Sequence, residues 1–155
     1  MIATAPALKL NLGCSDKHLK DHLNVDVCEP CDVRADLTQP WPWATSSVDA
    51  IVAWDIFEHL PDKLHTMNEA WRVLKPGAQL ELFVPTTDGR GAFQDPTHRS
   101  FWTPNDLFYF CREFGEWQRF HEAYGIMACF TVKQVQNKQY PHNVWKLWAV
   151  LEAVK

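Results

Sequence analysis

The segment from Asp88 to Trp102 concentrates side chains that can do chemistry, which is unusual for a simple connector. Its His98 and Asp95 can take or orient a proton, because imidazole and carboxylate groups are common general bases. Its Arg90 and Arg99 suit an anionic small molecule, since guanidinium groups pair well with phosphate or carboxylate. We therefore predict that His98 and Asp95 are catalytic. The alternative is that they only cap and brace a loop.

The same segment raises two questions about binding. Trp102 offers an apolar wall for a bound molecule. Asp95 and His98, together with Asp88 or His59, offer oxygen and nitrogen donors for a metal ion. No firm spacing supports a metal site, so we expect none.

Three carboxylates stand at the ends of predicted strands. Asp26 closes the second strand, thirteen residues after Gly13, and Asp36 and Asp55 follow the third and fourth strands. Because ligands of α/β sheets bind beyond the carboxyl ends of the strands, Asp26 is placed to accept from the hydroxyls of a ribose. Asp36 could accept from an amino group such as that of adenine. Each carboxylate alone is also compatible with an ordinary solvated loop.

Cys28 and Cys31 form a Cys-x-Pro-Cys motif, which is typical of thiol redox proteins. Such a site needs its first cysteine at the start of a long helix, and residues 32–37 show no amphipathic helical pattern. A zinc site would need a second pair of ligands. Redox chemistry therefore stays a less favoured alternative, and Cys111 and Cys129 are expected in the core.

The elements that must position these residues alternate between strand and helix. Apolar runs predict strands at 8–12, 24–27, 48–54, 79–84, 130–135 and 144–154, and a short one within 31–37. The clearest helix begins at Pro61-Asp62 with an apolar stripe of Leu64, Met67, Trp71 and Leu74. Residues 103–106 predict another helix start, and residues 15–22 allow at most two helical turns. This order predicts an α/β fold with a mostly parallel sheet and a final hairpin.

Composition narrows the class of protein. A chain of 155 residues fits a single domain over residues 1–155. Fifteen Lys and Arg against nineteen Asp and Glu give a net charge of −4, which makes nucleic acid an unlikely partner. Without a membrane-length apolar run or a secretion signal, we expect a cytoplasmic protein with no membrane partner and five reduced cysteines. The Trp-rich C-terminal segment, with Trp145 and Trp148, is core or the surface of a homodimer.

One set of residues resembles a known family. The stretches 10–15, 24–26, 35–37, 47–52, 57–62 and 71–78 resemble the class I S-adenosylmethionine-dependent methyltransferases, most specifically over residues 58–77. The resemblance implies a Rossmann-like seven-stranded, mostly parallel sheet with a C-terminal antiparallel hairpin and helices on both faces. It implies S-adenosyl-L-methionine as cofactor, with S-adenosyl-L-homocysteine as product. It also implies methyl transfer to a small-molecule acceptor, which we expect to be anionic or sugar-like.

The resemblance also implies roles for individual residues. Those expected along the methionine part of the cofactor are Asn11, Gly13, Cys14 and Ser15. Those expected at the ribose, adenine and sulfonium are Asp26, Val27, Asp36, Leu37, Trp54 and Asp55, and those at the acceptor are His59, Arg90, Arg99 and Trp102. The chain keeps only Gly13 of the usual glycine-rich loop, and it lacks the helix expected between the second and third strands. A catalytically weak binding module with this fold is therefore the alternative function.

Overall fold

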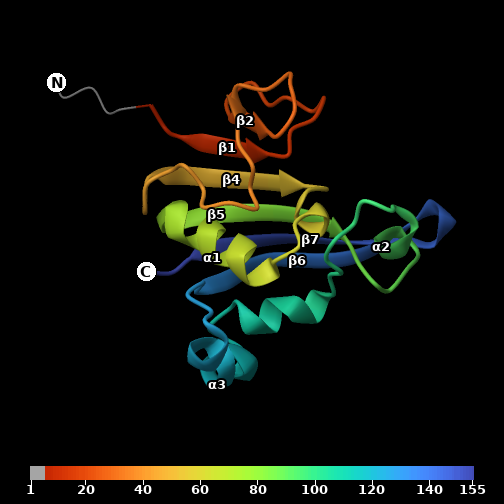
Figure 1. Ribbon diagram of the computed structural model, residues 1–155. Coiled ribbons are helices and arrows are strands. Elements are labelled where there is room, and N and C mark those ends of the chain that lie inside the picture. The colour runs from red at the N-terminus through yellow and green to blue at the C-terminus, as the bar shows by residue number, and fades with distance from the viewer. Residues whose placement is uncertain (1–5) are drawn as a thin grey trace.

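The computed structural model describes residues 6–155, in which seven strands form one sheet in the order β3-β2-β1-β4-β5-β7-β6 (Figure 1). The strands are β1 (Lys9–Leu12), β2 (Leu23–Asp26), β3 (Val33–Arg34), β4 (Val48–Trp54), β5 (Leu74–Pro85), β6 (Phe130–Tyr140) and β7 (Val144–Ala153). Strands β1 to β5 pair in parallel, and β7 runs antiparallel to both β5 and β6. The predicted α/β sheet with its C-terminal antiparallel hairpin is confirmed.

The helices are α1 (Lys63–Val73), α2 (Gly91–Gln94) and α3 (Gly115–Tyr124), with 3-10 helices η1 (Phe57–His59), η2 (Pro104–Tyr109) and η3 (Pro141–Asn143). Asp62 caps α1 by accepting from the His65 backbone N–H. Thr103 and Asp106 form a capping box at the start of η2, as the sequence predicts. None of these helices in the described residues is long and apolar enough to cross a bilayer.

One face of the sheet carries the core. Leu10, Ile51 and Leu80 are buried on this face, at paired positions of β1, β4 and β5. They belong to the same buried cluster as Met67 of α1, which lies across this face of the sheet (Figure 1). The predicted stripe of α1 is correct at Met67, which is fully buried, and wrong at Leu64, which is exposed, because the helix turns Ala70 and Val73 inward.

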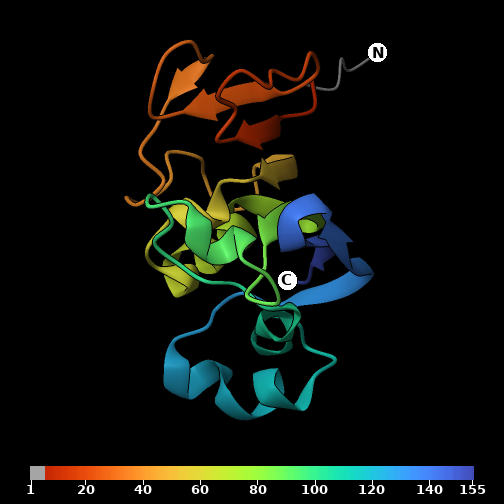
Figure 2. The ribbon, with the colours of Figure 1, turned by 90° about the vertical axis from the view of Figure 1, so that its right-hand side faces the viewer.

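The opposite face of the sheet is open, so the expectation of helices on both faces is wrong. Figures 1 and 2 show no helix packed on this face within residues 6–155. Residues 15–22 form turns rather than the predicted helical turns, and residues 27–32 form a tight loop. Trp54 and Trp148 lie on the open face, where both indole nitrogens donate to the carboxylate of Glu81, at 3.2 and 2.9 Å.

Some predicted boundaries also shift. Strand β5 begins at Leu74, directly after α1, and its pairing with β4 is irregular near Val48. Strand β6 continues to Tyr140, so the turn of the final hairpin is only the three residues of η3. Helix α3 was not predicted from the sequence, and none of its residues is fully buried.

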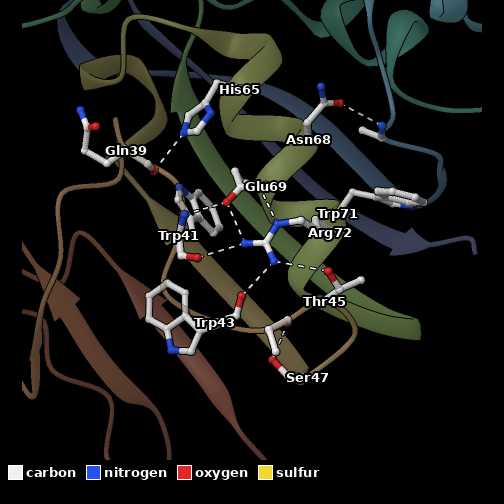
Figure 3. Close-up of polar contacts among 12 residues, drawn as sticks. Gln39, Trp41, Trp43, Thr45, Ser47, His65, Asn68, Glu69, Trp71 and Arg72 are labelled. Carbon is white, nitrogen blue, oxygen red and sulfur yellow. Dashed lines mark hydrogen bonds and ion pairs between the residues drawn. The ribbon is translucent and has the colours of Figure 1, made fainter.

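The segment 38–47, between β3 and β4, is fastened to α1 by a polar network (Figure 3). The Glu69 carboxylate accepts from the Trp41 backbone N–H at 2.6 Å and from Arg72 Nε at 2.6 Å. Arg72 also donates to the backbone carbonyls of Trp41 and Trp43, at 3.0 and 2.9 Å. The paired Arg72 guanidinium lowers the pKa of Glu69. This network fixes the segment that follows β3. Residues 35–38, which connect β3 to this segment, line the candidate site described below.

Candidate functional site

Two neighbouring cavities open beyond the carboxyl ends of the parallel strands. The strand-end cavity, about 260 Å³, is lined by Gly13, Asp26, Val27, Ala35, Asp36, Leu37, Thr38, Ile56, His59 and Leu60. The histidine cavity, about 210 Å³, is lined by Asp55, Glu58, His59, Pro85, Gly91, Gln94, Asp95, His98, Val144 and Lys146. Both lie where ligands of α/β sheets bind, at the point where the strand order reverses between β1 and β4. His59 lines both cavities.

Gly13 forms the floor of the strand-end cavity at the end of β1. Its φ of +63° lies in the left-handed region, and a Cβ atom there would stand 2.6 Å from the side chain of Ile56. Only glycine meets both conditions without strain. The chain can therefore turn at Gly13 and leave its backbone open to a ligand.

Two carboxylates reach the same cavity, as the sequence predicts. Asp26 accepts from the backbone N–H groups of Ser15 and Cys28, at 2.9 and 3.0 Å. Asp36 accepts from the backbone N–H and hydroxyl of Thr38, at 2.9 and 2.7 Å, and these bonds lower the pKa of Asp36. A carboxylate has about four acceptor sites. Each group is therefore fixed in place and still able to accept from a ligand.

The remaining walls of the strand-end cavity are mostly apolar. Val27 is 53% exposed, which is unusual for a valine and leaves its side chain free to contact a ligand. Ala35, Leu37, Ile56 and Leu60 line the same cavity. Apolar walls with a few polar groups are the usual composition of a small-molecule site.

Other predicted cofactor residues shape this region from a distance. Asn11 is buried, and its amide donates to the Lys17 carbonyl and the Asn24 side chain. Cys14 is also buried, and its backbone N–H donates to the Val25 carbonyl. Neither lines the strand-end cavity. Their contacts fix the turn after β1.

The remaining three predicted cofactor residues lie elsewhere. Ser15 is exposed and lines a separate hollow beside Asp26. Trp54 points to the open face of the sheet, so its expected place beside the sulfonium is wrong, since side chains alternate along a strand. Asp55 lines the histidine cavity, where it pairs with Lys146 at 2.6 Å.

Glu58 is the residue of the histidine cavity that sequence reasoning missed. It is 2% exposed, and its Oε2 atom has no hydrogen-bond partner among residues 6–155. Burial raises the pKa of its carboxyl to about 8; the carboxylates of Asp55 and Asp95 add to this shift, and Lys146 opposes it. The adjacent Glu58 and His59, directly before the strongest predicted helix, were the signal available in the sequence.

His98 and Asp95 come together in this cavity, as the sequence predicts, with His98 Nε2 3.8 Å from Asp95 Oδ2. His98 Nδ1 bonds the Ala92 carbonyl oxygen at 2.8 Å. A carbonyl only accepts, so the proton of neutral His98 sits on Nδ1. Its Nε2 atom therefore carries a lone pair.

His59 is held in the same way. Its Nδ1 lies 3.1 Å from the hydroxyl of Thr97, and this hydroxyl donates its own proton to Asp95 Oδ1 at 2.7 Å. His59 Nδ1 is then the donor, and its Nε2 also carries the lone pair. The bonds from Thr97 lower the pKa of Asp95 and keep it ionised.

The predicted acceptor residues divide into two groups. His59 lies in the site, whereas Arg90 and Arg99 are exposed and line neither cavity. Trp102 as a binding wall is wrong, because it is fully buried in the core and donates to Ser100 Oγ at 3.1 Å. For a tryptophan in a segment of polar residues, the sequence does not show whether the side chain faces the core or the cavity.

The two cysteines of the Cys-x-Pro-Cys motif are free and lie in the loop between β2 and β3. Cys28 is exposed and Cys31 is half-buried. Desolvation and the neighbouring Glu29 raise the pKa of Cys31, which is opposite to the shift that activates a redox thiol. Cys111 is buried in the core, as expected, whereas Cys129 is only half-buried, so its expected place in the core is wrong.

Comparison with known proteins agrees with this geometry. Residues 11–82 match the model of the methyltransferase domain family. A SAM-dependent methyltransferase from Methanosarcina mazei superposes with a TM-score of 0.64 at 13% identity, over 97% of this chain and 94% of that one. The 1,6-didemethyltoxoflavin-N1-methyltransferase of Burkholderia thailandensis, solved with S-adenosylhomocysteine, gives 0.64 at 16% identity, over 97% and 72%. A SAM-dependent methyltransferase from Archaeoglobus fulgidus gives 0.60 at 12% identity, over 94% and 86%.

A search of curated proteins gives no match. The sheet order and the cavities at the strand ends define a Rossmann-like α/β fold. More particularly, the family match bears out the resemblance to the methyltransferases over residues 11–82, and the solved structures, at 12–16% identity, share the fold.

Proposed function

We propose that this chain transfers a methyl group from S-adenosyl-L-methionine to a small molecule bound in the histidine cavity. The observation that carries the proposal is that His59 lines both cavities, so two bound molecules would be neighbours. When bound, the cofactor supplies an electrophilic methyl group and a neutral sulfide leaving group. The main task of the protein is then to align the acceptor atom with the methyl group and the leaving sulfur, and such alignment alone can lower the activation barrier substantially.

The strand-end cavity fits the nucleoside part of this cofactor. Gly13 keeps the backbone open, and Asp26 has free acceptor sites for ribose hydroxyls. Asp36 can accept from an adenine amino group, and Val27 and Leu37 offer apolar contact to the ring. These five residues would hold the nucleoside part of the cofactor.

On the acceptor side, His98 and Asp95 stay the proposed catalytic groups. His98 Nε2 has a free lone pair, and Asp95 is ionised beside it, so either can take a proton from an acceptor hydroxyl or amine. The one ammonium of the cavity, Lys146, is already paired with Asp55. Because the only ammonium of the cavity is already paired, the cavity favours a hydroxyl-bearing or amine-bearing acceptor, such as a sugar-like molecule, over an anion.

Calorimetric titration of S-adenosyl-L-homocysteine tests the proposal. Wild type should bind at micromolar concentration, about 8 kcal/mol of affinity, and Asp26→Asn should lose at least about tenfold. The variant keeps one acceptor oxygen, for the Ser15 backbone, and loses the one for the Cys28 backbone, so circular dichroism and thermal unfolding must show that the fold persists. Glu122→Gln, which removes an exposed carboxylate on α3, is the matched control and should bind like wild type.

The opposite outcome favours the alternative function. If wild type shows no heat and no thermal stabilisation at millimolar ligand, the proposal fails and a binding module with this fold becomes the better hypothesis. The open sheet face with Trp54 and Trp148 would then be the first surface to examine. A cytoplasmic location and a homodimer through the Trp-rich surface stay predictions.

A further inference from the structure

Three potential ligand atoms converge in the histidine cavity. Glu58, His59 and His98 each offer one donor atom, and these atoms lie within 4.8 Å of one another. Donor atoms on a tetrahedral ion with bonds of about 2.1 Å are about 3.4 Å apart. Small side-chain rotations would therefore close the set around one ion.

When neutral, the two imidazoles have the tautomer that a metal requires. A metal binds the unprotonated nitrogen, and the other ring nitrogen usually donates to a fixed partner that sets the tautomer. His98 Nδ1 has the Ala92 carbonyl as this partner, at 2.8 Å. His59 Nδ1 has the Thr97 hydroxyl, at 3.1 Å. The lone pair of each Nε2 atom is thereby free to bind a metal ion.

The carboxylate supplies a second, independent observation. Glu58 is 2% exposed, and its Oε2 atom is left without a hydrogen-bond partner by residues 6–155. A buried oxygen without a partner costs about 1–3 kcal/mol or more, so such groups usually have a function or a missing ligand. Glu58 lines the histidine cavity together with His59 and His98.

The charges around this point also favour a cation. Three carboxyl groups line the cavity, those of Asp55, Glu58 and Asp95, and the only ammonium among its lining residues is Lys146. Lys146 is paired with Asp55 at 2.6 Å, so the ammonium is not free to pair with Asp95. A cation bound between Glu58, His59 and His98 would lie in a cavity whose lining offers more carboxyl groups than free ammonium groups.

We propose that Glu58, His59 and His98 bind a divalent first-row transition metal ion, such as Zn²⁺, Co²⁺, Mn²⁺ or Fe²⁺. Two imidazoles and one carboxylate suit these borderline ions, and they leave coordination positions open toward the cavity. This departs from the sequence-based expectation of no metal.

The metal site deepens the proposed function and rests on it for the role of the ion. An acceptor oxygen or nitrogen that faces the open positions would have its pKa lowered by the ion. His98 would then be a ligand, and Asp95 would be the group that takes the proton. Binding of the ion itself needs neither methyl donor nor acceptor.

The test is calorimetric titration of Zn²⁺ alone into chelator-treated protein, repeated with Co²⁺ to record its visible ligand-field bands. Wild type should bind one ion per chain at micromolar concentration or tighter. Glu58→Gln and His98→Gln should each weaken binding at least about tenfold and alter the Co²⁺ spectrum. His121→Gln is the matched control, since His121 lies on α3, away from the cavity.

A further variant tests the supporting hydrogen bond. Thr97→Val removes the partner of His59 Nδ1 without removing a ligand and should weaken binding by about 10-fold to 100-fold. Circular dichroism shows whether each variant folds, and His59→Gln replaces any ligand variant that does not.

Some outcomes would overturn the metal site. One is that neither ion gives heat on titration into wild type at millimolar concentration. The other is that wild type, Glu58→Gln and His98→Gln bind the ion with equal affinity. Titration of S-adenosyl-L-homocysteine into the same chelator-treated protein tests the proposed function separately. Cofactor binding without metal binding removes only this inference, and the reverse result removes only the proposed function.

Discussion

The rings of His59 and His98 meet edge to face, with centroids 4.9 Å apart and an interplanar angle of 80°. Each ring is fixed through Nδ1 by the same short segment, which contributes the Ala92 carbonyl and the Thr97 hydroxyl. The segment that follows β5 therefore sets the geometry of a residue that follows β4. Mutations that disturb Ala92 or Thr97 should act on both histidines together.

Gly13→Ala should destabilise the protein and weaken cofactor binding. The substitution adds the strain of a positive φ and a Cβ atom 2.6 Å from Ile56, at a combined cost of about 2–4 kcal/mol. Gly77→Ala is the control, because Gly77 has a φ of +76° but no atom within 4 Å of the added Cβ. It should cost only about 1–2 kcal/mol. Urea unfolding gives both free energies, and equal losses would show that the contact with Ile56 is unimportant.

Glu69→Gln should lower stability by about 1–3 kcal/mol at pH 7, because it replaces a charged hydrogen bond to Arg72. The folded-state pKa of Glu69 is lowered, so its contribution is present above the unfolded pKa of about 4.3 and is lost as pH falls through the folded value. The difference between wild type and variant should therefore shrink below about pH 4 in urea unfolding. A difference that stayed constant down to pH 2 would contradict this role, and the exposed Glu122→Gln should show almost no difference at any pH.

Trp102 should matter for stability and not for binding. Trp102→Ala should cost about 3–5 kcal/mol, the usual range for a buried aromatic side chain. Trp102→Phe keeps most of the packing, loses the bond to Ser100, and should cost about 1 kcal/mol. The exposed neighbour Phe101→Ala should stay within about 0.5 kcal/mol. A Trp102→Phe variant with wild-type stability and lost ligand binding would instead place Trp102 in the site.

The thiols of Cys28 and Cys31 should show no enhanced reactivity. Because the pKa of Cys31 is raised, its alkylation by iodoacetamide at pH 7 should be slower than that of the exposed Cys28, as followed by mass spectrometry. The double variant Cys28→Ser, Cys31→Ser should bind S-adenosyl-L-homocysteine like wild type. Fast alkylation of Cys31, or loss of binding in the double variant, would revive the redox alternative.

The sequence predicted the sheet well, because buried parallel strands are continuous apolar runs. It placed Val48–Trp54 correctly and put Asp26 and Asp36 at strand ends, where the structure brings them to one cavity. The capping residues Asp62 and Thr103 were also readable, since a cap depends on local chemistry alone.

What the sequence missed depends on contacts between distant residues. Trp54 and Trp102 both lie beside polar residues, and only the packing decides that one faces an open sheet and the other the core. The unpaired Glu58 Oε2 atom is likewise invisible in sequence, because its lack of a hydrogen-bond partner among residues 6–155 follows only from the three-dimensional packing. The second helical layer was expected by resemblance and is replaced by turns in residues 15–22.

The C-terminal hairpin has a consequence for the order in which the two cavities can form. The Asn143 carbonyl accepts from the Arg90 backbone N–H at 2.9 Å, and Val144 and Lys146 line the histidine cavity. The strand-end cavity, in contrast, uses only residues up to Leu60. On the ribosome, where synthesis runs from the N-terminus, every residue that lines the strand-end cavity emerges before Val144 and Lys146. The histidine cavity therefore cannot be complete until the C-terminal hairpin has left the ribosome.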